Sequence, residues 1–186
     1  MEQIILASGS PRRKQLLEWA EIPFEVRVSD ADESYAAGMS FEETAIFIAK
    51  NKAMAVAASV PADKLVLAAD TIVVCNEEIF GKPASREEAI HFLSTLAGNS
   101  HKVITGVVMV KGDRVTSFAD VTTVHFHPLS SAQIAFYVDH YKPYDKAGAY
   151  AIQEWIGVVG IKGVEGDFYN VMGLPVSRVV QALRDF

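Results

Sequence analysis

The sequence contains very little cysteine: Cys75 is the only one among 186 residues, and it lies inside an apolar run. A single cysteine excludes an intramolecular disulfide framework and a cysteine-based zinc site. It is typical of a small buried residue in a reducing compartment. The sequence also lacks an apolar stretch of membrane-spanning length and a leader in which a basic segment precedes an apolar one. We therefore expect a soluble protein of the cytoplasm with no membrane partner.

Positive charge is scarce as well. Lys and Arg number 17 against 23 Asp and Glu, which gives a formal net charge of −6. General binding to DNA, RNA or anionic membranes needs a broad basic surface, so this balance argues against nucleic acid as a partner. We expect the basic residues that matter to act locally, inside a pocket.

No internal repeat, low-complexity segment or linker rich in proline, glycine and serine divides the sequence, and half of its residues are hydrophobic. A chain of this length can bury one good core, so we predict a single domain over residues 1–186. Alternating helix and strand patterns predict an α/β fold with a mixed, twisted sheet flanked by helices. The predicted strands cover residues 4–7, 64–74, 103–110, 115–126 and 156–161, and the predicted helices begin near residues 10, 40, 85, 130 and 175.

A motif suited to binding anions follows the first predicted strand. Ser10 and Pro11 have the residue types of a helix N-cap and of the first helical position. The hydroxyl of Ser8 and the guanidinium groups of Arg12 and Arg13 accompany this helix start. Free backbone N–H groups and the helix dipole favour negative charge there. The motif therefore predicts a ligand with one or more phosphate groups.

Asp70 interrupts the apolar strand predicted over residues 64–74. An unpaired charge is costly to bury, so this carboxylate needs a partner, a proton or a metal. It is either a structural residue bonded to a neighbouring loop, or a general base or metal ligand that faces a cleft. Thr71 points to the opposite face of a regular strand, so it shares a site with Asp70 only if the strand bulges or ends there.

Lys52 is a second charge within an apolar pattern. It falls on the same side of a predicted helix as Ala45, Ala49 and Val56, so its ammonium either reaches the rim of that stripe or faces an interior anion. Lys82 lies in a stiff loop, where a lysine taken alone is ordinary. Four basic residues together have the charge to bind a triphosphate: Arg12, Arg13, Lys52 and Lys82.

The acidic run over residues 30–33 has two interpretations. Such a run is usually a solvated surface, but it can also supply oxygen ligands for Mg²⁺. Mg²⁺ holds substrate phosphates with one or two protein carboxylates and several waters. Glu33 and Asp70 are therefore the candidate metal ligands.

Small residues, aromatic rings and amides are interleaved near Gln153 and again over residues 170–175. This composition suits a pocket in which a ring stacks on a nucleobase and an amide binds its edge through a paired donor and acceptor. It equally suits a tightly packed turn region. The residues alone leave both interpretations open.

Taken together, these motifs resemble the Maf family of nucleoside triphosphate pyrophosphatases over nearly the whole chain. Six motifs in order carry the resemblance: Ser8-Gly9-Ser10-Pro11-Arg12-Arg13, Ala69-Asp70-Thr71, Gly81-Lys82-Pro83, His101-Lys102-Val103-Ile104-Thr105-Gly106-Val107, Asp145-Lys146-Ala147-Gly148-Ala149-Tyr150-Ala151-Ile152-Gln153 and Asn170-Val171-Met172-Gly173-Leu174-Pro175. The resemblance implies hydrolysis of a nucleoside triphosphate to the monophosphate and pyrophosphate in a central nucleotide-binding cleft. It further implies a divalent cation, Mg²⁺ or Mn²⁺, and a homodimeric cytoplasmic enzyme.

The resemblance also implies roles for single residues. Asp70 falls on the family's proton acceptor, and Arg12, Thr71 and Gln153 match the subgroup that cleaves dTTP and UTP. The alternatives are the 7-methyl-GTP subgroup of the same family and a nucleotide-binding regulator of cell division that does not catalyse. This chain departs from the family where Glu154 and Trp155 follow Gln153, because members often have glycine there.

Overall fold

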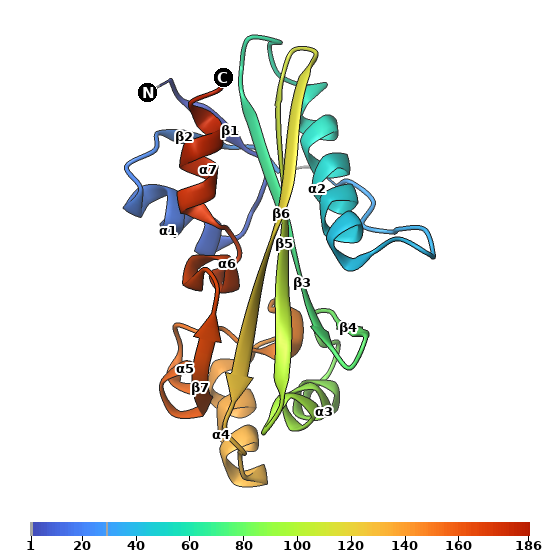
Figure 1. The fold of residues 1–186 in the computed structure, drawn as a ribbon, viewed down its shortest axis with the longest axis vertical. Helices are drawn as coiled ribbons and strands as arrows, with labels where there is room; N and C mark the ends of the chain where they lie inside the picture. The colour runs from blue at the N-terminus through green and yellow to red at the C-terminus, as the bar shows by residue number, and fades with distance from the viewer. Residues whose placement is uncertain (1, 29) are drawn as a thin grey trace. The chain divides into compact units, whose positions relative to one another are not determined.

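The computed structural model describes residues 2–28 and 30–186. Its strands are β1 (Ile4–Leu6), β2 (Phe24–Val26), β3 (Val66–Cys75), β4 (Glu78–Phe80), β5 (Ser100–Lys111), β6 (Arg114–Phe126) and β7 (Ile161–Glu165). Its helices are α1 (Pro11–Trp19), α2 (Phe41–Ala57), α3 (Arg86–Leu96), α4 (Ser131–Tyr141), the 3₁₀ turn η1 (Ala147–Ala149), α5 (Trp155–Gly160), α6 (Phe168–Met172) and α7 (Val176–Leu183). Within the described residues the strands form a mixed sheet in the order β2-β1-β3-β5-β6-β7, with β4 paired to β3 (Figure 1).

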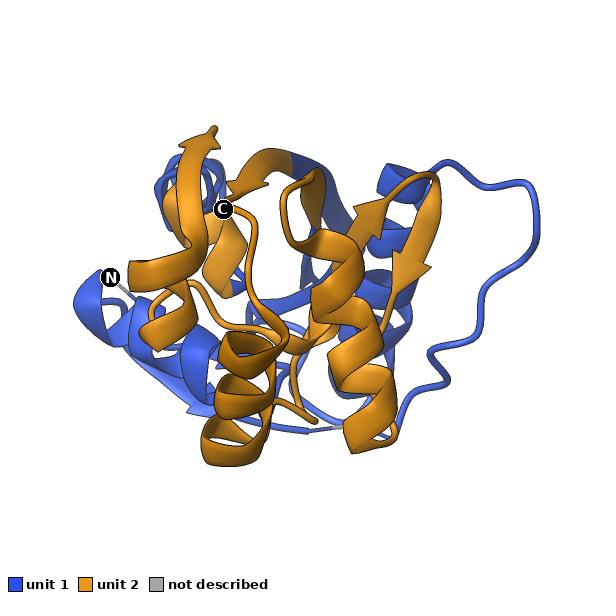
Figure 2. Ribbon diagram, turned by 90° about the horizontal axis from the view of Figure 1, so that it is seen from below, with its two compact units in different colours: residues 1–71, 105–120, 173–186 blue, residues 72–104, 121–172 orange. Residues whose placement is uncertain are grey.

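The chain divides into two compact units, drawn in blue and orange in Figure 2. Unit 1 comprises residues 1–71, 105–120 and 173–186, and unit 2 comprises residues 72–104 and 121–172. Strands β3, β5 and β6 each contribute one part to unit 1 and the other part to unit 2. Segments that are far apart in the sequence therefore meet inside each unit.

In unit 1, helix α2 covers one face of the sheet, while α1 and α7 lie on the other (Figure 1). Strand β1 pairs in parallel with both β2 and β3. Apolar residues from α2 and from three strands form one core cluster: Ala49, Ala53 and Val56 with Ile5, Val66, Ala68, Val108 and Val110. Gly106 permits this close packing, because a Cβ atom there would lie 2.3 Å from the backbone carbon of Ala45.

In unit 2, β4 pairs antiparallel with the end of β3, and β7 pairs antiparallel with the end of β6. Helices α3 and α4 pack together. The guanidinium of Arg86 joins them by donating to both carboxylate oxygens of Asp139, at 2.6 and 2.9 Å. His101 of β5 is buried against the rings of Phe126 and Tyr150, and its Nε2 lies 2.6 Å from the Tyr150 hydroxyl.

The predicted α/β class and the mixed sheet flanked by helices are confirmed. Ser10, Ser40 and Ser130 cap their helices as their positions predict, each accepting a hydrogen bond from a backbone N–H of the first turn. Cys75 is buried. Among residues 2–28 and 30–186, no helix has the length and apolar character needed to span a membrane.

The strand predicted over residues 156–161 is wrong. Residues 155–160 form helix α5, and the strand begins only at Ile161. The run of β-branched residues favours a strand by propensity, but Ile156 is fully buried on the helix. Gly157 packs so closely that a Cβ atom would lie 1.7 Å from the carbonyl oxygen of Ile152. Packing within unit 2 therefore overrides the local preference.

Candidate active site

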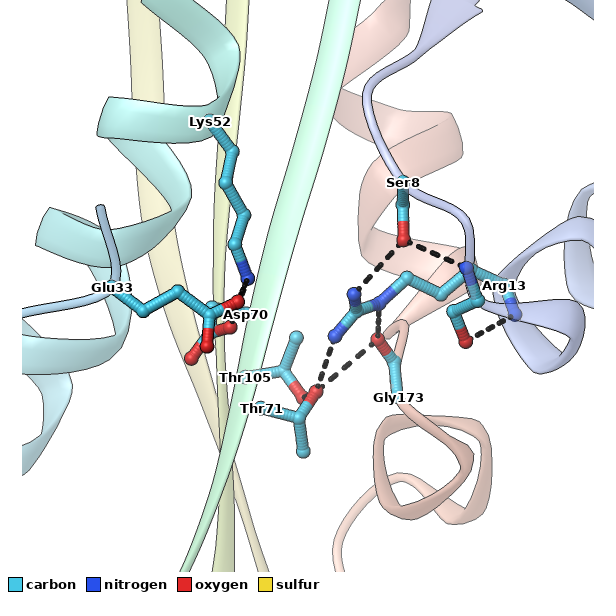
Figure 3. A network of polar contacts seen from close by, with 9 residues as sticks. Ser8, Arg13, Glu33, Lys52, Asp70, Thr71, Thr105 and Gly173 are labelled. Carbon is cyan, nitrogen blue, oxygen red and sulfur yellow. Dashed lines mark hydrogen bonds and ion pairs between the residues drawn. The ribbon is translucent and has the colours of Figure 1, made fainter. Parts of the chain in front are cut away.

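Arg13 is held by three acceptors, two of which come from distant parts of the sequence (Figure 3). Its Nε donates to the carbonyl oxygen of Gly173 at 2.8 Å. Its Nη1 donates to Ser8 Oγ at 3.2 Å, and its Nη2 donates to Thr71 Oγ1 at 3.0 Å. A guanidinium has five N–H donors, so these bonds fix its plane and leave one N–H on each terminal nitrogen for a ligand. We call Ser8, Arg13, Thr71, Thr105 and Gly173 the Arg13 cluster.

The turn between β1 and α1 brings its hydroxyls beside this guanidinium. Ser8 Oγ accepts a second bond, from the backbone N–H of Ser10 at 3.2 Å. Ser10 Oγ in turn accepts from the backbone N–H of Arg13 at 3.5 Å and so caps α1. Since both bonds to Ser8 use its oxygen, its hydroxyl proton is left to donate. Backbone, hydroxyl and guanidinium donors therefore converge at one helix start.

The charges around Arg13 affect one another. Burial lowers the pKa of the Arg13 guanidinium, Asp70 raises it, Arg12 lowers it and Glu33 raises it. Arg12 is half-buried on the first turn of α1. Arg13 therefore lies within electrostatic range of the Asp70 and Glu33 carboxylates.

Lys52 bridges two carboxylates on the α2 side of the sheet (Figure 3). Its Nζ lies 2.6 Å from Asp70 Oδ1 and 2.8 Å from Glu33 Oε1. The side chains of Lys52 and Asp70 are 16% and 14% exposed, whereas that of Glu33 is 56% exposed. Lys52 therefore faces an interior anion and does not extend to the rim. We call these three residues the Lys52 cluster.

Asp70 and Thr71 lie on opposite sides of β3. The strand is continuous from Val66 to Cys75, so successive side chains alternate between its faces. Figure 3 shows Asp70 beside Lys52 on one side of the strand and Thr71 beside Arg13 on the other. The two residues therefore belong to different clusters, as expected for a strand that does not bulge.

The sequence pattern missed two members of the Arg13 cluster. Thr105 of β5 is fully buried, and its Oγ1 lies 2.9 Å from Thr71 Oγ1. A hydroxyl inside an apolar strand is the same kind of signal that drew attention to Asp70. Gly173 contributes only its backbone carbonyl oxygen, which no side-chain pattern can reveal.

Two further candidate residues, Lys82 and Gln153, belong to unit 2, whereas the Arg13 and Lys52 clusters belong to unit 1. Lys82 is exposed in the segment that follows β4. Gln153 is exposed and lines a hollow of about 370 Å³, together with Ile152, Lys162 and Phe168 among others. An amide at the wall of a partly apolar hollow can bind a planar polar ring.

The two residues that follow Gln153 are anchored by contacts with α4 and Lys146. Glu154 accepts a hydrogen bond from the Tyr137 hydroxyl, and its other oxygen lies 3.6 Å from Lys146 Nζ. Tyr137 also accepts from the backbone N–H of Ala151 at 3.1 Å. The ring of Trp155 packs against Phe136. The two residues that follow Gln153 therefore join it to α4 through Tyr137 and Phe136.

The Lys52 cluster fits a magnesium or manganese ion that also binds substrate oxygens. In the part of the chain that the structure describes, no three His, Cys, Asp or Glu side chains group so as to hold a metal by themselves. Mg²⁺ does not need such a cage, because one or two carboxylates, waters and phosphates complete its shell. Oxygens of Asp70 and Glu33 already converge on one cation, the ammonium of Lys52.

Comparison with known proteins decides the family. A family model described as Maf-like protein matches residues 3–186. The chain belongs to the Maf family. A dTTP/UTP pyrophosphatase of Cytophaga hutchinsonii is 53% identical to this Maf protein over 180 residues, covering 97% of this chain and 82% of the relative. A dTTP/UTP pyrophosphatase of Parabacteroides distasonis is 48% identical, covering 99% and 96%.

The fold of this Maf protein is shared with a solved structure. A HAM1 protein from Coxiella burnetii superimposes with a TM-score of 0.52 and covers 100% of both chains. The two sequences are only 14% identical, so the likeness concerns the fold.

Proposed function

We propose that this Maf protein is a nucleoside triphosphate pyrophosphatase, which hydrolyses dTTP and UTP to the monophosphate and pyrophosphate. The observation that carries the proposal is Asp70: a carboxylate in the middle of a buried strand, paired with Lys52 and Glu33 and near enough to Arg13 to shift its pKa. The names of relatives at 48–53% identity support the same reaction.

The Arg13 cluster supplies the fixed donors for the phosphates. Arg13 is oriented before substrate arrives, because Gly173, Ser8 and Thr71 hold its guanidinium in one plane. Two N–H groups of Arg13 and the hydroxyl proton of Ser8 remain to bind phosphate oxygens. Ser10 and Arg12 add an N-cap hydroxyl and a second positive charge at the same helix start. Lys82 of unit 2 is proposed as a further substrate-binding residue.

Asp70 is proposed as the general base, which takes a proton from the water that attacks the α-phosphorus. Its position on a rigid strand fixes the direction in which it accepts that proton. A divalent cation held by Asp70 and Glu33 would neutralise charge on the phosphate oxygens. Most of the rate enhancement then comes from positioning and from charge neutralisation, as is usual for transfer of phosphoryl groups.

Base preference is proposed to depend on Arg12, Thr71 and Gln153. The Gln153 amide offers one donor and one acceptor to the edge of a pyrimidine. Thr71 acts through Arg13, since its hydroxyl oxygen accepts a bond from that guanidinium.

We also propose that residues 1–186 function as one domain in the cytoplasm and that the protein is a homodimer. Light scattering would then give twice the chain mass of 20.3 kDa.

The test is release of pyrophosphate from dTTP, UTP, CTP, GTP and 7-methyl-GTP, with and without Mg²⁺ or Mn²⁺. The proposal expects cation-dependent release with dTTP and UTP as the best substrates. Preference for 7-methyl-GTP would reassign the subgroup. Tight nucleotide binding with no release from any substrate would instead support a non-catalytic regulator.

A further inference from the structure

Lys52 contacts the same two carboxylates that are proposed to bind the metal. Its Nζ is 2.6 Å from Asp70 Oδ1 and 2.8 Å from Glu33 Oε1, and its side chain is largely buried between them (Figure 3). A lysine whose only task was to bind phosphate would be expected to point its ammonium at the phosphate site. Here both ion pairs must weaken before the ammonium can turn to a substrate.

An ammonium and a divalent cation cannot both hold these oxygens closely. Mg²⁺ and Mn²⁺ bind carboxylate oxygens at about 2.0–2.2 Å, and a neighbouring ammonium at hydrogen-bond distance would repel the ion. Burial strengthens that repulsion, because Lys52 and Asp70 are shielded from water. Lys52 and the metal therefore compete for Asp70 and Glu33.

A triphosphate would resolve the competition. Its oxygens offer the Lys52 ammonium alternative anionic partners and complete the shell of the metal. Of the two carboxylates, Glu33 is the one that can move more easily. Its side chain is 56% exposed, and residues 30–40 belong to no helix or strand. Asp70, by contrast, is fixed in the middle of β3.

We propose that Lys52 occupies the metal-binding carboxylates in the nucleotide-free protein, so that the divalent cation binds well only together with the nucleotide. The inference rests on the proposed function, since it assigns metal binding to Asp70 and Glu33. Lys52 thereby positions both carboxylates while the site is empty of substrate and couples metal binding to nucleotide binding. Such coupling is reciprocal: the metal raises nucleotide affinity by the same factor.

The test measures binding of Mn²⁺ alone, without nucleotide, by electron paramagnetic resonance of the free ion. Wild type is compared with Lys52→Met and Lys52→Gln, which remove the competing charge. We expect both variants to bind Mn²⁺ about 5- to 150-fold more tightly than wild type, the usual range of such couplings. Lys52→Arg keeps a cation and should bind Mn²⁺ as weakly as wild type.

Lys111→Met is the matched control. It removes one lysine charge from the same unit, but Lys111 pairs with Glu2 and not with the site. Its Mn²⁺ affinity should equal that of wild type. Mn²⁺ binding by folded Lys52→Met or Lys52→Gln that is no tighter than wild type would overturn the inference. If wild type instead releases no pyrophosphate from any nucleotide, the proposed function fails while the comparison of Mn²⁺ affinities still stands.

Discussion

Asp70 places a negative charge in an otherwise apolar part of β3, and Lys52 compensates it. The pair is largely buried, with Asp70 Oδ1 and Lys52 Nζ 2.6 Å apart. Breaking a buried pair from one side leaves an unmatched charge, which is costly. The residue types at these two positions are therefore constrained by folding as well as by chemistry.

Asp70→Asn separates the requirement of folding from the requirement of catalysis, because the amide keeps the shape of the side chain but is a poor base. We expect turnover of dTTP to fall about 10²- to 10⁴-fold, the usual contribution of a general base. Nucleotide binding measured without a divalent cation should change little, since other residues hold the phosphates. Steady-state kinetics and calorimetry with a non-hydrolysable analogue measure the two effects. Asp63→Asn, at an exposed turn, is the control; wild-type turnover in Asp70→Asn would remove Asp70 from this role.

Thr71→Val removes an acceptor from Arg13 without changing the volume of the side chain much. The Arg13 Nη2 group then loses its bond at 3.0 Å, and Thr105 loses a hydroxyl partner at 2.9 Å. We expect the free energy of unfolding to fall by about 1–3 kcal/mol, the cost of buried polar groups left without partners. Urea unfolding measures this loss, and Thr71→Ser should recover most of it. An unchanged midpoint in Thr71→Val would show that Thr71 does not hold Arg13.

At the scale of elements, Gly106 lets α2, which carries Lys52, pack directly against β5. Gly106→Ala would place a Cβ atom 2.3 Å from the Ala45 backbone, so helix and strand must move apart. We expect a loss of about 3 kcal/mol or more in unfolding free energy, because overpacking against backbone cannot relax by side-chain rotation. Turnover should fall too. Gly81→Ala is the control, since nothing lies within 4 Å of its Cβ position. Equal stability of the two variants would contradict this view of the packing.

His101 makes the stability of unit 2 depend on pH. Burial, with a smaller effect of His125, lowers the pKa of His101 from 6.5 to about 4. Between these values the unfolded chain binds a proton that the folded chain does not, so stability rises with pH across this window and is lost as pH falls toward 4. The full effect is about 3 kcal/mol. Urea unfolding from pH 4.5 to 7.5 measures it, and His101→Gln should flatten the dependence; an equal slope in the variant would assign it to other groups.

Local signals were sufficient to predict most elements and part of the site. Ser10 and Ser40 cap helices where the sequence predicts them, because a cap depends on residues within one turn. The strand predicted at Ile156 is wrong because burial decides that segment. Asp70 and Lys52 stood out as charges in apolar patterns. Their direct contact, and the roles of Thr105 and Gly173, depend on segments brought together only by folding.

At the scale of the whole molecule, an acidic protein is proposed to bind a polyanion. Because the protein has a net charge of −6, long-range electrostatic attraction does not draw an anionic substrate toward it. The proposed substrate binding therefore relies on short-range groups such as Arg12, Arg13 and Lys52 in unit 1. Acidic residues elsewhere need not weaken such local contacts, because salt screens charges beyond about 8–10 Å.

The most direct test of the central claim is hydrolysis of dTTP by the wild-type protein in water enriched with ¹⁸O. Attack of water on the α-phosphorus forms the new bond there, so mass spectrometry should find the label in dTMP and none in pyrophosphate. Label in pyrophosphate would place the attack on the β-phosphorus, and labelled orthophosphate would place it on the γ-phosphorus. Either result would contradict the account.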